Sequence, residues 1–570
     1  MKGFRHITLV CLALWQALWL TAGPALGAEL PTAGPEAASV SRASSAVKEA
    51  ACPEAALVPQ ASSAVKEVAG PETAAAVEAS PDWEASYSAP KYEFRGAWIS
   101  TVAQAKYAKM SAVEMQDYFM GLLDSLQRTG INVVLFQVRP QADAWYKSSL
   151  EPWSMYITGK SGRNPGWDPL AFMVEACHAR GMDIHAWVNP YRVRLTFRES
   201  DWQEAFIRRH RDWTVRYGRS LWFDPGIPAC RRHIVKVIRE IVSQYDVDGL
   251  HMDDYFYPYP IAGESFADAR TYARYSDGTM SLADWRRDNV NTLVQELSQA
   301  IHEEKPWVQF GISPFGIWRN HKDDAEGSQT NGLANYDDLY ADALLWMREG
   351  WIDYCIPQLY WELNHPQAAY TTLLDWWARH AYGCPLVVGQ DVARSVKPRV
   401  TLPGDPASAL PQLREKMDLQ RANQGTLGSC FFPAYELETN TGGAATLLRE
   451  NYYAHPALVP TAALADTLAP NPEPVYALDV RFDYELGCHL VWKRVNMADP
   501  LCRASSFVVY RVRKGQPEDL SDASNIVCVT SDCRLVLPPH PAKGDWVYLV
   551  TSLNRLHRES APERIVVRVK

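Results

Sequence analysis

The sequence of 570 residues has no strongly basic stretch, and its formal net charge at pH 7 is −9. This charge argues against nucleic acid as a partner. Beyond the N-terminal region no further run of about twenty apolar residues follows, so the mature chain is expected to have no transmembrane segment. The histidines show no HxH or HExxH spacing, and no glycine-rich loop follows the first strand candidate. No metal or other cofactor is therefore expected.

Residues 1–28 have the pattern of a secretory signal. Lys2 and Arg5 precede an apolar run, and Ala25, Leu26 and Gly27 give a small-residue cleavage pattern. The sequence therefore predicts export, to the periplasm or out of the cell, where association with the cell wall is an option.

Composition divides the rest of the chain. Residues 29–90 are rich in Ala, Ser, Pro and Glu, and the segment 43–56 recurs with small changes at 61–75. Because this segment has too little apolar bulk to build a core, we predict a disordered tether. Residues 91–455 are expected to form the main domain, followed by a Pro/Ala-rich linker at 456–474 and a small domain at 475–570.

Strand-like apolar runs alternate with helical patterns throughout the main domain. Helical spacing and capping residues predict helices at 110–130, 167–181, 229–246, 283–304, 336–350, 368–380 and 408–422. The strand candidates are 94–100, 131–140, 182–192, 249–258, 308–316, 352–362, 385–391 and 428–436. Runs that are apolar on both faces are typical of parallel strands covered by helices. The predicted fold class is α/β with a TIM-like (β/α)8 barrel, and an open doubly wound sheet is the alternative.

The last hundred residues have a different pattern. Short strand candidates follow one another at regular spacing, at 477–483, 488–495, 505–514, 525–532, 533–538, 545–555 and 564–570. This spacing predicts an all-β sandwich, and residues 546–562 resemble the closing hairpin of a fibronectin type III domain. Cys488, Cys502, Cys528 and Cys533 lie in this region, and one or two disulfides among them would suit an oxidising compartment.

Residues 247–260, VDGLHMDDYFYPYP, form a short apolar run that ends in two adjacent carboxylates among Tyr and Phe. Strand alternation puts His251, Asp253 and Tyr255 on one face. For a single Asp-Asp pair, a turn or a helix cap is the simpler interpretation. A buried carboxylate is costly unless it is paired or hydrogen-bonded, however, and similar polar and aromatic residues end all eight strand candidates. This repetition favours a site.

The active site of a barrel lies at the carboxyl ends of its strands. Trp stacks on sugar faces, amides and Arg bind sugar hydroxyls, and paired acids divide proton transfer from attack on the anomeric carbon. The strand ends therefore indicate a carbohydrate-cleaving site. The candidate substrate-binding residues are Trp98, Gln137, Arg139, Asp143, Asn189, Tyr191, Tyr255, Gln358, Trp361 and Asp391.

Seven motifs carry a family resemblance: EFRGAWIST, GINVVLFQVRPQADAWY, SSLEPWS, DIHAWVNPYR, VDGLHMDDYFYP, FGISPFGIWRN and YCIPQLYWE. Through them residues 92–455 resemble the glycosyl hydrolase-like family 10, a group of exported bacterial barrel proteins. The resemblance implies hydrolysis of a bacterial wall glycan, such as peptidoglycan glycan strands that lack stem peptides, or of another polysaccharide. The chain is also similar to the chitinase pattern DGxDxDxE, but Tyr255 stands at the position of the acidic Glu. The acetamido-assisted chitinase mechanism is therefore not carried over.

The sequence supports one mechanism hypothesis. Asp253 or Asp254 is expected to act as nucleophile or base, and Glu362 is the leading proton donor, because an apolar neighbour such as Trp361 raises the pKa of a carboxyl group. Asp143 and Asp391 are reserve candidates for the second carboxylate. The separation of the two carboxylates would decide between a retaining and an inverting course.

Two other functions stay open. One is a carbohydrate-binding or wall-associated barrel without turnover, which would bind glycan and release no reducing ends. The other is a metal-dependent hydrolase that uses His185, His251 and Asp253, which the histidine spacing disfavours.

Overall fold

The structure is a computed structural model that describes residues 89–460, 471–485, 487–537 and 543–569. The predicted signal, nearly all of the predicted tether and half of the 456–474 linker lie outside these residues. Within the described ranges, no helix combines the length and the apolar character that a membrane crossing requires.

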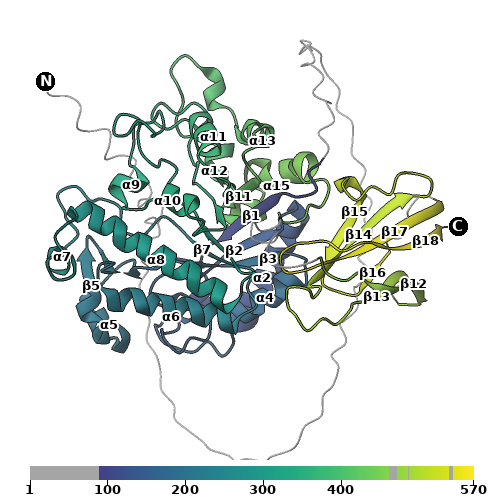
Figure 1. Ribbon diagram of the computed structural model, residues 1–570, viewed down its shortest axis with the longest axis horizontal. Coiled ribbons are helices and arrows are strands. Elements are labelled where there is room, and N and C mark those ends of the chain that lie inside the picture. Colours follow the sequence, from purple (N-terminus) through teal and green to yellow (C-terminus); the bar gives the residue numbers. More distant parts are fainter. Residues whose placement is uncertain (1–88, 461–470, 486, 538–542, 570) are drawn as a thin grey trace, which may run out of the picture. The chain divides into compact units, whose positions relative to one another are not determined.

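Eight parallel strands form a curled sheet at the centre of the main domain (Figure 1). The strands are β1 (Phe94–Ile99), β2 (Val133–Arg139), β3 (Asp183–Val188), β7 (Gly249–Met252), β8 (Gln309–Ile312), β9 (Tyr354–Cys355), β10 (Val388–Asp391) and β11 (Gly428–Phe432). Their order is β10-β11-β1-β2-β3-β7-β8-β9. Isolated parallel bridges link Cys355 to Leu386 and Gln358 to Gly389, next to the edge strands β9 and β10. The prediction of eight parallel strands separated by helices is confirmed.

Helices connect these strands. They include α2 (Ala112–Thr129), α4 (Pro169–His178), α6 (Pro228–Gln244), α8 (Leu282–Glu304), α11 (Tyr370–Arg379) and α13 (Leu413–Ala422). Local sequence sets their ends: α2 begins with a capping box between Ser111 and Glu114 and ends at Gly130, which adopts a left-handed φ of 96°. The single helix predicted at 336–350 was wrong. Tyr340 has a φ of 55° and separates α9 (Asn335–Asp338) from α10 (Ala343–Arg348).

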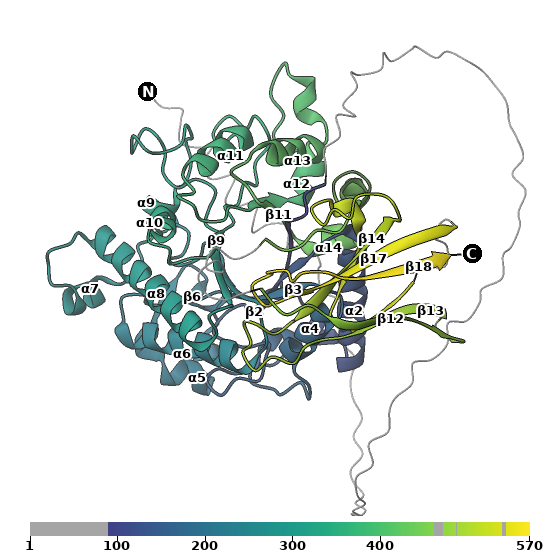
Figure 2. The same ribbon diagram turned by 45° about the vertical axis from the view of Figure 1, so that its right-hand side comes forward.

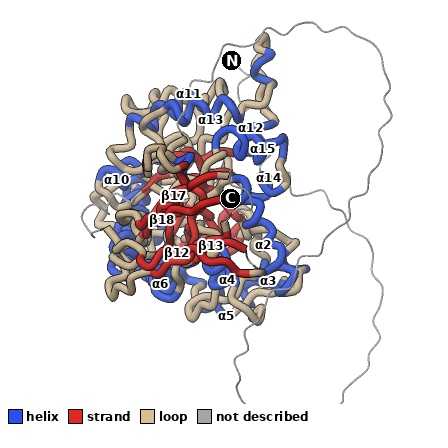
Figure 3. The backbone as a smooth tube through the Cα atoms, turned by 90° about the vertical axis from the view of Figure 1, so that its right-hand side faces the viewer, coloured by secondary structure: helices blue, strands red, loops and turns tan. Residues whose placement is uncertain are grey.

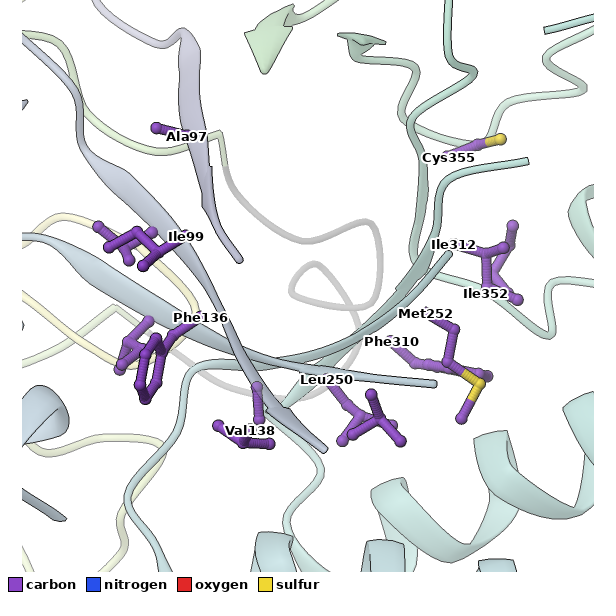
Figure 4. Close-up of a cluster of buried hydrophobic side chains, with 14 of the residues drawn as sticks. Ala97, Ile99, Phe136, Val138, Leu250, Met252, Phe310, Ile312, Ile352 and Cys355 are labelled. Carbon is purple, nitrogen blue, oxygen red and sulfur yellow. The ribbon is translucent and has the colours of Figure 1, made fainter. Parts of the chain in front are cut away.

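The two faces of the curled sheet carry different side chains. Figure 4 shows apolar side chains on the outer, helix-facing side, among them Ala97 and Ile99 of β1 and Leu250 and Met252 of β7. Because successive strand residues point to opposite faces, the residues between them point inward. The inner set includes Trp98, Leu135, Trp187 and Tyr354 together with the polar residues Gln137, His185 and His251. The interior of the curled sheet is thus the side on which the polar strand-end residues gather.

An insertion that the sequence patterns did not predict follows β3. Its strands β4 (Arg192–Arg194), β5 (Thr214–Tyr217) and β6 (Ser220–Phe223) form an antiparallel sheet in the order β4-β6-β5, with α5 (Ala205–Arg209) between β4 and β5. Strands of three or four residues are too short to show a clear alternation. Because the insertion begins at the carboxyl end of β3, it lies at the end of the sheet where a barrel site is expected.

The C-terminal region contains two antiparallel sheets, drawn in yellow-green to yellow in Figure 2 and as red strands in Figure 3. One sheet contains β12 (Tyr476–Asp483), β13 (Gly487–Lys493) and β16 (Arg534–Val536), and the other contains β14 (Ser506–Arg513), β15 (Ile526–Thr530), β17 (Gly544–Leu553) and β18 (Glu563–Val569). Trp492 of the first sheet and Phe507 and Tyr548 of the second share one core. The predicted all-β region is confirmed, whereas its fibronectin type III identity stays a prediction. Cys488, Cys502, Cys528 and Cys533 are all free, so the expected disulfides are absent from the described part of the chain.

Candidate active site

Asp253 and Asp254 follow directly after β7, which ends at Met252. Both carboxyl groups are nearly buried, at 4% and 1% exposure of the residue. The Trp187 indole N–H donates to Asp253 Oδ2 at 3.2 Å, and the Asn189 amide donates to Oδ1 at 3.3 Å. The end of the neighbouring strand β3 therefore fixes the Asp253 carboxyl group.

Asp254 is held from another direction. The Tyr259 hydroxyl donates a short hydrogen bond to Asp254 Oδ2. The other oxygen, Oδ1, is buried and receives no hydrogen bond from the residues that the structure describes. A buried oxygen that receives no hydrogen bond costs free energy, and such groups occur at sites that act on ligands. Oδ1 of Asp254 is thus a buried acceptor that is available to a substrate or a water molecule only when one reaches the pair.

The two carboxyl groups differ in proton affinity. Burial raises the pKa of Asp253 to about 7; the Asp254 charge adds to this rise, and the Arg192 charge opposes it. Burial raises the pKa of Asp254 to about 6, where the Tyr259 hydrogen bond opposes the rise. Because both values lie near neutral pH, the pair can hold a single proton there, and the larger rise at Asp253 favours the proton on Asp253. Two carboxyl groups in different protonation states are what acid/base catalysis near neutral pH needs.

Arg192 is the cation beside this pair. Its Nε and Nη2 donate to the Pro140 carbonyl oxygen at 3.0 and 2.6 Å, and its backbone N–H donates to Asn189 Oδ1 at 3.0 Å. The guanidinium lies 5.4 Å from the centre of the Tyr255 ring. These contacts fix Arg192 in the loop that also carries Asn189.

Aromatic rings adjoin the two aspartates. Tyr255 contacts Tyr259 at a ring-centre distance of 5.5 Å, Tyr259 contacts Phe315 at 6.1 Å, and Phe315 contacts Trp361 at 5.3 Å. All four rings are partly exposed. A second series consists of Trp98, Phe432 and Tyr360, with ring-centre distances of 6.5 and 6.0 Å. Such rings offer the apolar faces on which sugar rings stack.

A hydrogen-bonded chain runs through the interior of the sheet below Asp253. Trp98 Nε1 can only donate, so the contact of 3.3 Å with His251 Nε2 makes that nitrogen an acceptor. His251 Nδ1 then donates to the Tyr354 hydroxyl at 3.1 Å, and this hydroxyl donates to His185 Nδ1 at 2.6 Å. Burial lowers the pKa of His185 to about 4, and it lowers the pKa of His251 well below its usual value. Both rings are therefore neutral parts of the interior.

This chain bears on the metal-dependent alternative. Among the described residues, no three His, Cys, Asp or Glu side chains form a group that could hold a metal ion. The Tyr354 hydroxyl lies between His185 and His251 and uses one ring nitrogen of each. These donors do not fit a metal site with Asp253.

Two of the residues predicted to bind substrate have partners within the fold. Gln137 Oε1 accepts hydrogen bonds from the backbone N–H groups of Thr101 and Val102 at 3.0 and 2.9 Å. Arg139 is fully buried and forms a bidentate ion pair with Glu151, at 2.7 and 2.6 Å. The β2–β3 register shifts between Gln137 and Arg139, so Arg139 pairs with the outward-facing Val188. This bulge places Arg139 behind the site.

We expect Glu151→Gln to destabilise the fold by about 3–5 kcal/mol, because it leaves the buried Arg139 charge without its counter-charge. Burial alone would raise the Glu151 pKa, but Arg139 and His233 lower it to about 2. The measurement is the midpoint of urea unfolding, with Glu199→Gln as the control, since the Glu199–Arg216 pair is exposed. If stability is unchanged and KM is raised, Arg139 binds substrate, as predicted from the sequence.

Glu362, the predicted proton donor, lies in different surroundings. Its Oε1 accepts from the backbone N–H groups of Arg399 and Val400, at 2.8 and 3.2 Å. Together with Leu402 and Asp405 it lines a small pocket. These contacts of Glu362 do not involve the two aspartates, and its role as proton donor stays a prediction.

The other candidates divide into two groups. Asp143 accepts from Gln141 Nε2 at 3.0 Å, Asp391 caps α12 (Val392–Val396), and Tyr191 is buried in the outer core. The contacts given for these three side chains are with other parts of the fold. Asn189, Tyr255 and Gln358 interact with the aspartates, whereas Trp98 is linked to them through His251 and Trp361 through Phe315 and Tyr259.

Comparison with known proteins shows the family of the chain. The family model described as glycosyl hydrolase-like 10 matches residues 93–398. The chain is 38% identical over 478 residues to the glycosyl hydrolase YngK of Bacillus subtilis, a match that covers 82% of this chain and 92% of that protein. The chain belongs to the glycosyl hydrolase-like 10 family. It is also 38% identical over 373 residues to the glycosyl hydrolase DigH of Escherichia coli, which covers 59% of this chain and 82% of DigH.

Solved structures are more distant from this family member. The glycoside hydrolase domain of PgaB (BpsB) from Bordetella bronchiseptica has 13% sequence identity and a TM-score of 0.38, over 63% of this chain and 98% of that chain.

Three residues at the site were given no catalytic or binding role from the sequence, although two of them were recognised as strand-end residues. They are Trp187 and Arg192, which flank Asn189 in the motif WVNPYR, and Tyr259, five residues after Asp254. Trp187 and Tyr259 donate to the aspartates, and Arg192 lowers the pKa of both. Their positions beside strand ends were the available signal, since the motifs of the glycosyl hydrolase-like 10 family in this chain contain Trp187 and Arg192.

Proposed function

We propose that this protein is an exported glycoside hydrolase that cleaves a bacterial wall glycan, such as peptidoglycan glycan strands, or another polysaccharide. The observation that carries the proposal is the buried pair Asp253 and Asp254 at the end of β7, which Trp187, Asn189 and Tyr259 hold in place and whose pKa values are both raised toward neutral pH. Membership of the family and the names of its relatives YngK and DigH agree with hydrolysis of a glycosidic bond.

In the proposed reaction Asp253 is the proton donor. It gives its proton to the glycosidic oxygen as the bond from that oxygen to the anomeric carbon breaks, and the leaving sugar departs as an alcohol. Asp254 is the ionised partner and acts at the anomeric carbon, directly or by taking a proton from water. Water supplies the new hydroxyl group of the product and the proton that restores Asp253.

The surroundings of each acid suit its role. Asp253 is 4% exposed, and this burial favours the protonated form more strongly than the Trp187 hydrogen bond to Oδ2 opposes it. Asp254 accepts the Tyr259 hydrogen bond, which favours the ionised form, and keeps Oδ1 without a donor from the described residues. The partly exposed rings of Tyr255, Phe315 and Trp361 would carry the sugar units.

The experiment that tests the proposal incubates the purified protein with peptide-stripped sacculi and with a panel of other polysaccharides. Mass analysis of the soluble fraction should show new reducing ends for the wild type and none above background for Asp253→Asn. Release of sugar at equal rates by both proteins would remove Asp253 from the reaction.

A glycan-binding barrel without turnover is the second candidate, and one observation favours it. The two carboxyl groups are 4% and 1% exposed, so a substrate has little direct access to them in this conformation. This function predicts that the wild type binds the same glycans and releases no reducing ends from any of them.

A further inference from the structure

The insertion after β3 carries a concentration of exposed arginines. Between residues 195 and 223 six arginines are exposed, and the exposed acids are Glu199 and Asp212. The exposed arginines are Arg198, Arg208, Arg209, Arg211, Arg216 and Arg219. Arg208, Arg209 and Arg211 lie together in the segment RRHR at 208–211, whereas acids and apolar residues separate the other three arginines from them and from one another. Against a net charge of −9 for the whole chain, this surface is locally cationic.

Five residues of the insertion lie in contact with one another and form what we call the arginine strip: Phe197, Trp202, Arg211, Arg216 and Arg219. The Arg211 guanidinium lies 4.5 Å from the Trp202 ring centre, and Trp202 packs edge-on against Phe197 at 4.9 Å. The Arg216 guanidinium lies 5.9 Å from the Phe197 ring, and the Phe197 N–H donates to the Arg219 carbonyl oxygen at 2.7 Å. The strip thus combines guanidinium groups with a partly exposed indole.

The arginine strip is connected to the loop that holds Asp254. Arg216 of β5 and Arg219 of the turn that follows lie on either side of Tyr217 and Gly218. The Ile261 N–H donates to the Tyr217 hydroxyl at 2.7 Å, and the Gly218 N–H donates to Glu264 at 2.8 Å. Ile261 is two residues beyond Tyr259, whose hydroxyl donates to Asp254. These contacts place the Arg216–Arg219 end of the strip beside residues 261–264, in the loop that follows the catalytic pair.

We infer that the arginine strip extends the substrate site and binds an anionic glycan, a sugar polymer with carboxylate groups along its length. The inference rests on the proposed function and specifies its substrate class. Guanidinium groups bind carboxylates through two parallel hydrogen bonds, and an indole face stacks on a sugar ring.

The ion pair at the strip leaves room for such a ligand. Arg216 and Glu199 approach to 3.1 Å, with side-chain exposures of 61% and 74%. An exposed pair of this kind is worth little, so a carboxylate of the ligand can take the place of Glu199. The turnover chemistry needs no cation at this position, which separates the role of the strip from that of Arg192.

The test measures binding on the full chain with Asp253→Asn, so that cleavage does not interfere. The probes are peptide-stripped glycan strands with free lactyl carboxylates and the same strands after methyl esterification. We expect the charged strands to bind at least tenfold more tightly at low ionic strength, with most of this difference lost at about 1 M salt. The strip variant carries three further substitutions, Arg211→Gln, Arg216→Gln and Arg219→Gln. It should bind the charged strands at least tenfold more weakly and bind the esterified strands as before.

A matched variant separates the strip from overall charge. Arg449→Gln, Arg564→Gln and Arg568→Gln remove the same charge from exposed ion pairs elsewhere, where the arginine side chains are 48%, 47% and 69% exposed. The inference is overturned if this control weakens binding as much as the strip variant, or if the strip variant binds charged strands normally. Strip-dependent binding to phosphatidylglycerol vesicles in place of the strands would also overturn it. A wild type that cleaves nothing would instead count against the proposed function, because the binding difference requires no turnover.

Discussion

Asp253→Asn lowers kcat on the cleaved glycan by about 10³-fold, because the asparagine side chain has no proton to give to the glycosidic oxygen. The fold is expected to persist. Asn can accept the Trp187 hydrogen bond that Asp253 Oδ2 accepts at 3.2 Å, and it removes a buried acid. The measurement is the release of reducing ends, with the thermal midpoint recorded for the same preparations.

Glu362→Gln is the matched control for this loss. Its amide oxygen can still accept from Arg399 and Val400, so the local structure is kept while the carboxyl proton is removed. We expect kcat close to that of the wild type. If Glu362→Gln loses as much activity as Asp253→Asn, Glu362 becomes the proton donor and the role assigned to Asp253 is wrong.

Asp254→Asn is the second change with a large expected effect, a loss of about 10³-fold or more in kcat. A neutral amide cannot stabilise positive charge at the anomeric carbon or take a proton from water. The losses of kcat in Asp253→Asn and Asp254→Asn should depend differently on whether the leaving group needs a proton. When the cleaved glycan carries a nitrophenyl group at its reducing end, the leaving phenolate needs no proton, so Asp253→Asn should recover most of its activity while Asp254→Asn should not.

The opposite pattern, recovery by Asp254→Asn alone, would exchange the two roles. Tyr259→Phe gives an independent check on Asp254, since the Tyr259 hydrogen bond lowers the pKa that burial raises to about 6. Without this hydrogen bond the pKa rises further, and more alkaline conditions are needed to ionise Asp254. The measurement is the pH dependence of kcat/KM, in which Tyr259→Phe should shift the rise in activity to higher pH. If the rise stays at the pH of the wild type, ionisation of Asp254 does not control the rate.

The strands were predictable from the sequence because buried parallel strands are continuous apolar runs, and the helix ends were predictable from caps such as Ser111 with Glu114. The insertion at 192–223 was not predicted, since its strands span four residues or fewer. The break in the helix predicted at 336–350 was missed because Tyr340, a residue without special turn preference, adopts a positive φ.

The site was predictable to the extent that parallel strands bring their carboxyl ends together. This geometry brings Asn189 of the β3 end to Asp253 after β7. Arg139 was expected to bind substrate, but a bulge in β2 turns its side chain outward to Glu151. Glu362 was expected to lie beside the aspartates. Its position could not be predicted because β9 spans two residues and ends at Cys355, seven positions earlier, so strand alternation does not set the direction of the Glu362 side chain.

The pH dependence of kcat/KM tests the central claim most directly, because it reports the two ionisations of the free protein. Activity should rise with pH as Asp254 loses its proton near pH 6 and fall as Asp253 loses its proton near pH 7. The predicted profile is a narrow bell between these limbs, and Asp253→Asn should keep the acid limb and lose the alkaline one. A profile that is flat across this range, or an alkaline limb that persists in Asp253→Asn, would contradict the claim that this pair performs the acid/base chemistry.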